Sequence, residues 1–483
     1  MQKSEQKGDY AGTWQGSLKV GNGMELPLVF HFKFEGGKYT GTLDSPAQGA
    51  LGMQFDAVAV DASGKIQAGI AKLHASFDGV LQPGQKSITG NWVQMGAALP
   101  ISLSQVESYV GPRRPQEPKP PFPYKCEDVQ FKDGDAVLSG TLTVPAGGAA
   151  GVGAASDPGS ALGAGSVSTA DERASARTYP AVVLIHGSGP HDRDETIFSH
   201  KPFLLLADYL TRRGIVVLRY DKRGCGKSTG NIKAATTKDF SDDALAAVEF
   251  LKTRAEVDES RIGLIGHSEG GVIAPCVAGQ SSDVHFIVLM AASALPGDQI
   301  LLSQVRALSR DSSKAELAKN LEIASSTYAI LKAEPDNAKA VEQIKAMRKR
   351  LGAPEYTSSG QLQQAAQQEL NAGLPAMTSA WYRYFISFDP REALAKVKCP
   401  VLALNGELDS QVPASQNLAA IKSSLEAGGN KNLTVVTLPG LNHLFQHCKS
   451  GLPGEYASIE ETISPSVLKQ IGDWILSGDA GAK

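Results

Sequence analysis

The chain contains few cysteines, no long apolar run and no excess of charge of either sign. Its five cysteines show no C-x-x-C spacing, which argues against a zinc site or a redox-active cysteine pair. With 47 basic and 50 acidic side chains the formal net charge is −3, so nothing favours nucleic acid or an anionic membrane surface as a partner. No apolar stretch approaches the roughly 18 residues that span a bilayer, so we expect no membrane span.

The N-terminal residues also do not predict a targeting segment. Residues 1–7 are polar and do not contain the apolar core of a signal peptide. An exported protein in its mature form with an added Met would show the same residues. From these residues alone, both a cytoplasmic and an exported location therefore stay open.

A nucleotide-binding loop is also missing. Residues 224–229 resemble the end of a phosphate-binding loop, but the full pattern requires a glycine where Asp221 stands. We interpret residues 221–224 (Asp-Lys-Arg-Gly) as a structural turn whose charges pair locally. The sequence thus predicts neither a nucleotide nor a metal, and we expect no cofactor.

Apolar periodicity divides the chain into a β-rich part and a larger part in which strands alternate with helices. Alternating runs separated by turn residues predict a small antiparallel sheet, barrel-like or a sandwich, with Trp14 and Trp92 in its core. The later alternation of strands and helices predicts a mostly parallel α/β sheet. We therefore expect an antiparallel β domain at 9–108, a proline-rich linker at 109–123, an α/β core at 124–295 and 396–483 with a flexible Gly/Ala/Ser-rich insertion at 146–178, and a helical cap at 296–395.

Residues 266–270 have the pattern G-x-S-x-G at the end of a short apolar run. Residues 261–265 are typical of a buried strand, and the apolar spacing after Gly270 is helical. A serine at such a strand-to-helix corner lies on a sharp turn with its hydroxyl exposed at the carboxyl edge of a sheet. Side chains at Gly266 and Gly270 would collide with the neighbouring helix and strand. Ser268 is therefore the candidate nucleophile, with an ordinary turn serine as the alternative.

A serine hydroxyl needs a base to take its proton and an acid to orient that base. On this architecture the chain order is Ser, then Asp or Glu, then His, each in a loop after a strand. Strands predicted at 400–404 and 433–438 are followed by Asp409 and His443. The nearest alternatives are Glu407 for the acid and His447 for the base. We favour Asp409 because side chains two residues apart share a face and only the distal one reaches past the strand end.

An acyl-transfer site also requires backbone N–H donors for the oxyanion that develops on the substrate. One donor is expected from Glu269, directly after the nucleophile. A strand predicted at 179–185 ends in a His-Gly-Ser-Gly segment, from which we expect the second donor at Ser188. The side chains or backbone expected to line a substrate pocket are those of His186, Gly187, Trp381 and Tyr384.

These segments together resemble the α/β-hydrolase superfamily. The chain is most similar to bacterial carboxylesterases near the serine aminopeptidase group, which carry a β-rich N-terminal domain and a helical cap. The resemblance spans about residues 124–477, more loosely 9–108, and it suggests an exported or periplasmic protein. It rests on the segments 184–190, 221–226, 266–271, 405–409 and 442–445.

The sequence therefore predicts a serine hydrolase that cleaves short-chain carboxylic esters, acting on a small molecule without a cofactor. An aminopeptidase or amidase using the same three side chains is one alternative, with Glu322 or Glu334 holding the substrate's amino group. A ligand-binding protein with a vestigial hydrolase domain is another. Whether the protein forms a homo-oligomer stays open.

Overall fold

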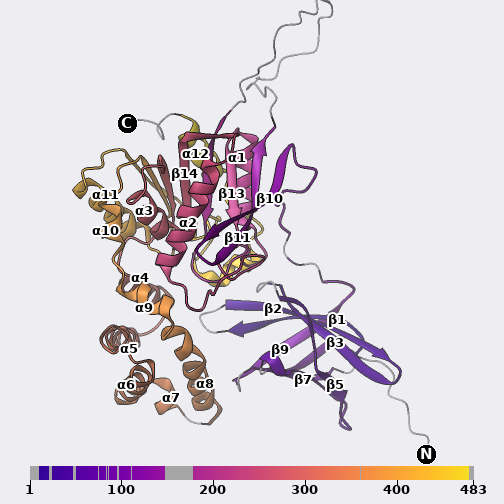
Figure 1. The fold of residues 1–483 in the computed structure, drawn as a ribbon. Coiled ribbons are helices and arrows are strands. Elements are labelled where there is room, and N and C mark those ends of the chain that lie inside the picture. The colour runs from indigo at the N-terminus through magenta and orange to yellow at the C-terminus, as the bar shows by residue number, and fades with distance from the viewer. Residues whose placement is uncertain are drawn as a thin grey trace, which may run out of the picture.

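The computed structural model describes residues 10–477 except 21–23, 47–49, 74, 83, 85, 95–96, 110, 112, 147–177 and 359. The flexible insertion expected at 146–178 lies outside the described residues but for its two end positions. Figure 1 shows two separate sheets, one built from the N-terminal strands and one from the rest of the chain.

The N-terminal sheet is an antiparallel barrel, which agrees with the predicted all-β domain. β2 pairs with β1 on one side and with β3 on the other, and this double pairing closes the ring. Trp14, Phe30, Phe77 and Trp92 are buried inside it, as predicted for the two tryptophans. The strands are β1 (Gly12–Val20), β2 (Met24–Glu35), β3 (Lys38–Ser45), β4 (Ala50–Gln54), β5 (Ala57–Val60), β6 (Lys65–Ile70), β7 (Ala75–Leu81), β8 (Ser87–Gln94) and β9 (Ala97–Val106).

The second sheet is mostly parallel, which confirms the predicted α/β class. Its order is β10-β11-β13-β12-β14-β15-β16-β17, and only the β10–β11 and β11–β13 pairs are antiparallel. Covered on both faces, its central strands are continuous apolar runs. The strands are β10 (Tyr124–Asp133), β11 (Ala136–Pro145), β12 (Tyr179–Ile185), β13 (Val216–Tyr220), β14 (Val257–His267), β15 (Phe286–Met290), β16 (Val401–Gly406) and β17 (Leu433–Leu438).

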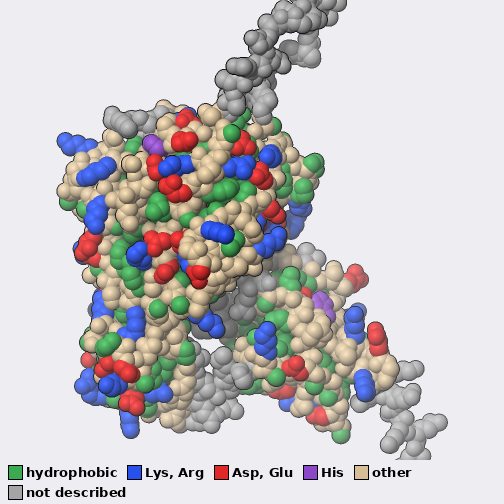
Figure 2. All heavy atoms as spheres, in the orientation of Figure 1, with side chains coloured by type: hydrophobic (Ala, Val, Ile, Leu, Met, Phe, Trp, Pro, Cys, Tyr) green, Lys and Arg blue, Asp and Glu red, His purple; other side chains and the backbone are tan. Residues whose placement is uncertain are grey.

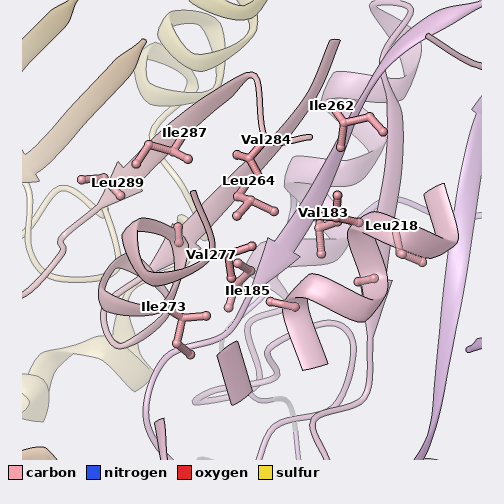
Figure 3. Close-up of a cluster of buried hydrophobic side chains, with 14 of the residues drawn as sticks. Val183, Ile185, Leu218, Ile262, Leu264, Ile273, Val277, Val284, Ile287 and Leu289 are labelled. Atoms are coloured by element: carbon pink, nitrogen blue, oxygen red, sulfur yellow. The ribbon is translucent and has the colours of Figure 1, made fainter. Parts of the chain in front are cut away.

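Helices pack on both faces of this sheet. α1 (Pro202–Arg212) and α12 (Pro465–Leu476) cover one face. α2 (Thr237–Lys252), α3 (Gly270–Ala278) and α11 (Ala414–Ala427) cover the other. In Figure 3 the α3 side chains Ile273 and Val277 lie against the strand residues Ile185 and Leu264. The burial of these side chains fixes α3 directly behind the end of β14.

The chain between β15 and β16 is helical, as its apolar spacing predicts. The helices are α4 (Gly297–Leu308), α5 (Lys314–Ala333), α6 (Asn337–Arg350), α7 (Pro354–Thr357), α8 (Gly360–Met377), α9 (Ala380–Ser387) and α10 (Pro390–Leu394). They have a small core of their own, formed by Leu331, Ile344, Leu374 and Ile386 among others. None of the helices in the described ranges is both long and apolar enough to cross a membrane. On the face drawn in Figure 2, acidic and basic side chains are interspersed.

The proline-rich segment after the barrel is bound to the α/β part of the molecule. The Arg114 guanidinium donates hydrogen bonds of 2.9 Å each to the carbonyls of Phe198, Ala457 and Ile459. The Gln116 amide donates to the Ile463 carbonyl at 2.7 Å. The segment is therefore fixed to the α/β part by the side chains of Arg114 and Gln116. Its proline-rich composition alone does not indicate these contacts.

Candidate active site

Ser268 lies on the turn between β14 and α3 with a backbone φ of +54°. This left-handed conformation is costly for a residue with a side chain and is held by its surroundings. A Cβ on Gly266 would lie 2.0 Å from the carbonyl oxygen of Gly270, and a Cβ on Gly270 would lie 2.0 Å from that of Ile185. The predicted reason for both glycines is thus confirmed, because helix and strand approach too closely for any side chain.

Ser268 opens into a cavity of about 250 Å³ between the sheet edge and the helices that follow β15. α4 contributes Ile300, Leu301 and Gln304, and α9 contributes Trp381 and Phe385. The remaining lining comes from loops at the strand ends: Gly187, Ser188, His191, Glu195, Ile197, His267, Glu269, Ser293, Gln411, Val412, His443 and Leu444. Apolar side chains of α4 and α9 therefore lie in the same cavity as the polar groups of Ser268 and His443.

His443 and Asp409 lie on the loops after β17 and β16, and both are buried. The Nδ1 of His443 lies 2.8 Å from Oδ2 of Asp409. Oδ1 of Asp409 accepts hydrogen bonds of 2.8 Å from the backbone N–H groups of Gln411 and Val412. A carboxylate can only accept, so Nδ1 carries the proton and leaves Nε2 of a neutral ring free to accept one.

The two alternatives considered for acid and base lie elsewhere. Glu407 is exposed and accepts a hydrogen bond from the backbone N–H of Gly440 at 3.1 Å. His447 is exposed and pairs through Nδ1 with Glu461 at 2.9 Å. Neither residue lines the cavity that holds Ser268.

Ser188 and Glu269 both line the cavity beside Ser268. Neither backbone N–H has a hydrogen-bond partner among the described residues. The Gly187 N–H, by contrast, is already donated to Oε1 of Glu195 at 2.6 Å. Two unpartnered N–H groups next to a serine are what an oxyanion site requires.

The structure corrects two of the four expected pocket residues. Gly187 and Trp381 line the cavity, but the His186 ring is fully buried beneath the loop against Phe203 and Tyr220. Burial lowers the pKa of His186 to about 3. Tyr384 lines a different cavity together with Phe388, on whose ring it stacks.

A buried ion pair behind the turn escaped the sequence interpretation. His267 donates from Nδ1 to Glu195 Oε1 at 3.2 Å and from Nε2 to the His443 carbonyl at 3.1 Å. Because both acceptors lack a proton, both ring nitrogens must carry one. Burial opposes a charged ring, yet the Glu195 carboxylate raises the pKa of His267. Burial likewise opposes ionisation of Glu195, but the charge of His267 lowers the pKa of that carboxyl to about 2.

The turn at residues 221–224 differs from its sequence interpretation. Its charges pair with residues far along the chain: Asp221 binds Arg193 at 2.9 Å and Arg223 binds Asp243 at 2.7 Å. Lys222 is buried and lies 3.1 Å from Oε2 of Glu269. Local pairing fails because the turn is enclosed by other segments, which bring partners that no sequence spacing indicates.

Glu269 also connects the turn to the helices above it. Its Oε1 accepts hydrogen bonds from Trp381 Nε1 at 2.6 Å and from Thr237 Oγ1 at 2.7 Å. The residue after Ser268 thus fixes one wall of the cavity.

Within the described ranges, no group of three or more His, Cys, Asp or Glu side chains is arranged to hold a metal ion.

Comparison with known proteins places this site in a family context. The model of the family described as serine aminopeptidase, S33, matches residues 177–447, more than half of the chain. The chain is 29% identical over 302 residues to Esterase EstD of Thermotoga maritima, an alignment that covers 62% of each protein. The chain thus covers somewhat less than two thirds of the length of EstD.

The matching solved structures are more distant in sequence. The α/β hydrolase GrgF from Penicillium sp. sh18 shares 17% identity, with 74% of this chain and 99% of that one covered and a TM-score of 0.42. The Pyrococcus furiosus esterase Pf2001 shares 15% identity, with 69% and 91% covered and a TM-score of 0.38.

The close approach at Gly266 predicts that Gly266→Ala will be destabilising. Its Cβ would meet the backbone of α3, so overpacking should lower the unfolding free energy by about 1–3 kcal/mol and displace the turn. Thermal unfolding and ester turnover measure the two effects. Gly69→Ala is the matched control, since its Cβ would meet only the Ala75 carbonyl oxygen at 3.9 Å. Equal melting temperatures for both variants would contradict the packing argument.

The Glu195–His267 pair predicts a pH-dependent stability. The pKa of Glu195 is lowered in the folded protein, so its carboxylate stabilises the fold fully at pH values above the pKa of the unfolded chain, about 4.3. This stabilisation is lost as the pH falls towards 2. The pKa of His267 is raised in the folded protein, so its charged ring stabilises the fold fully at pH values below the pKa of the unfolded chain, about 6.5. This stabilisation is lost as the pH rises through the pKa of the folded protein.

Glu195→Gln should therefore lower the free energy of unfolding most between about pH 4.5 and 6.5, by on the order of 3 kcal/mol. At lower and at higher pH the loss of stability should be smaller. Chemical unfolding of parent and variant across this range measures the difference. Glu407→Gln removes an exposed carboxylate and should show no such dependence. A loss of unfolding free energy in Glu195→Gln that stays constant with pH would contradict the ion pair.

Proposed function

This chain belongs to the serine aminopeptidase (S33) family of α/β-hydrolases, and we propose that it is an esterase that cleaves short-chain carboxylic esters. The observation that carries the proposal is the juxtaposition in one cavity of three features. These are a serine on a left-handed turn, a histidine bound through Nδ1 to a buried aspartate, and two backbone N–H groups with no partner among the described residues. The esterase EstD, related over 302 residues, supports the same reaction class.

In the proposed first half-reaction, Ser268 Oγ attacks the ester carbonyl while Nε2 of His443 takes the hydroxyl proton. Asp409 holds the ring in the tautomer that leaves Nε2 free and stabilises the imidazolium that forms. The Ser188 and Glu269 N–H groups donate to the oxyanion. The carbon–oxygen bond to the alcohol then breaks, and His443 returns the proton to the departing alcohol.

In the second half-reaction, water attacks the acyl group bound to Ser268. His443 takes a proton from this water, and the tetrahedral intermediate again places its oxyanion on the two N–H groups. Collapse of the intermediate breaks the bond to Ser268 Oγ, which recovers its proton from His443. The products are one alcohol and one carboxylic acid.

The size of the cavity supports a short acyl chain. Its volume of about 250 Å³ is below the range of roughly 300–1,000 Å³ typical of sites for drug-sized ligands. Ile300, Leu301 and Phe385 present apolar side chains to a bound acyl or alcohol group. These side chains favour a small apolar substituent over a long chain or a charged one.

The aminopeptidase alternative requires a carboxylate available to the amino group of a substrate. Glu322 is exposed on α5, and Glu334 bonds to the Asp336 N–H and the Gln343 amide; neither lines the cavity. The two glutamates that do line it, Glu195 and Glu269, already bind groups of the protein. The ester substrate is therefore the better supported one.

Replacing the nucleophile tests the proposal directly. Ser268→Ala should lower hydrolysis of nitrophenyl butyrate at least ~10³-fold with little change in melting temperature, since the hydroxyl carries the reaction but little packing. A fluorophosphonate probe should label the parent and not the variant. A parent that is not labelled would instead support a ligand-binding protein with a vestigial site. Faster cleavage of aminoacyl anilides than of esters would favour the aminopeptidase.

A second pair of variants tests the acid. Asp409→Asn should lower kcat by about 10³–10⁴-fold, because an amide in place of the carboxylate permits the wrong ring tautomer of His443. Glu407→Gln makes the same chemical change two residues away, where the side chain contacts only the Gly440 N–H, and should leave kcat nearly unchanged. A larger loss for the glutamate variant would assign the acid to Glu407.

A further inference from the structure

Lys222 is a buried lysine that the proposed reaction steps do not use. It follows β13, and its side chain is only 4% exposed. Its ammonium donates to the Gly187 carbonyl at 2.9 Å and to Oε2 of Glu269 at 3.1 Å, and it lies 4.1 Å from the centre of the Phe240 ring. Burying a cation without such partners is costly, so each contact fixes its position.

The two acceptors of this lysine belong to the two proposed oxyanion donors. The Gly187 carbonyl and the Ser188 N–H are opposite ends of one peptide group, so a bond at the carbonyl sets the direction of the N–H. Glu269 supplies the other N–H from its own backbone, and its carboxylate binds the same ammonium. One side chain thus holds both donors relative to each other.

Further contacts hold the Gly187–Ser188 segment from its other sides. The Gly187 N–H donates to Oε1 of Glu195 at 2.6 Å, and Nε2 of His191 donates to the Ser188 carbonyl at 2.8 Å. A glycine peptide in a loop has many accessible conformations. With these groups bonded, the Ser188 N–H is left without a partner in the part of the chain that the structure describes, and it is free to bind an oxyanion.

The charge of Lys222 also matters for an oxyanion. Glu269 carries a carboxylate with no exposed side-chain surface, close to the N–H that would bind the oxyanion. An uncompensated negative charge there would oppose a second one on the substrate, strongly so in a low-dielectric interior. The ammonium neutralises this carboxylate and polarises the Gly187–Ser188 peptide in the sense that strengthens its N–H as a donor.

We propose that Lys222 is a positioning residue of the oxyanion site, which aligns the Ser188 and Glu269 N–H groups and offsets the Glu269 charge. This inference rests on the proposed esterase function. It assigns to the turn at residues 221–224 an indirect part in transition-state stabilisation, through the two N–H groups that Lys222 aligns. Substrate binding in the ground state should depend on it little, because the N–H groups act mainly on the oxyanion.

The test compares Lys222→Met with Lys227→Met, an exposed lysine of the same turn region with 73% of its side chain accessible. Removing a direct oxyanion donor costs about 10²–10³-fold in kcat, so an indirect loss at Lys222 should lower kcat about 10- to 100-fold. KM should change little, and affinity for a butyl trifluoromethyl ketone, which forms an oxyanion on the serine, should fall in proportion to kcat/KM. Lys227→Met should match the parent in all three.

Lys222→Met leaves the Glu269 carboxylate buried without its cation, which destabilises the fold independently of any effect on the oxyanion site. The double variant Lys222→Met with Glu269→Gln removes both charges and still lacks the bond to the Gly187 carbonyl, so it should keep a reduced kcat and weak ketone binding. Parental kcat and ketone affinity in a folded Lys222 variant would overturn this inference alone. Absence of ester turnover in the parent enzyme would overturn the proposed function and this inference with it.

Discussion

The close backbone approach at the turn around Ser268 is the constraint on which the site depends. β14 and α3 meet so tightly that Gly266 and Gly270 have no space for a Cβ, and Ser268 adopts a left-handed backbone as a result. The buried apolar faces of α3 and the central strands hold this strained geometry in place. Packing far from the hydroxyl therefore determines where the hydroxyl lies.

Buried charges form a second layer behind that turn. Lys222 pairs with Glu269, and His267 pairs with Glu195, with each pair also bonded to the backbone of the loop or of a cavity residue. Burying ion pairs rarely adds net stability, because desolvation offsets much of the attraction. Their value here is geometric: they leave few alternative positions for the Gly187–Ser188 peptide and for His443.

The helices between β15 and β16 form part of the cavity at the edge of the sheet. α9 contributes Trp381, whose indole N–H binds the carboxylate of Glu269 on the turn below. This hydrogen bond thus connects α9 directly to the turn that carries Ser268.

Local features of the sequence determined much of this protein. Strands at 179–185 and 433–438 were predicted with the bounds that the structure has. The first is a short, fully buried apolar run, and the second is an edge strand in which apolar residues are interspersed with threonines. The G-x-S-x-G turn and the order of Ser268, Asp409 and His443 also follow from segments that can be recognised one at a time. The tertiary structure alone decided which charges pair and which side of α9 faces the cavity. Those contacts join residues as far apart as 72 positions for Glu195 and His267 and 112 for Glu269 and Trp381, and no local pattern encodes them.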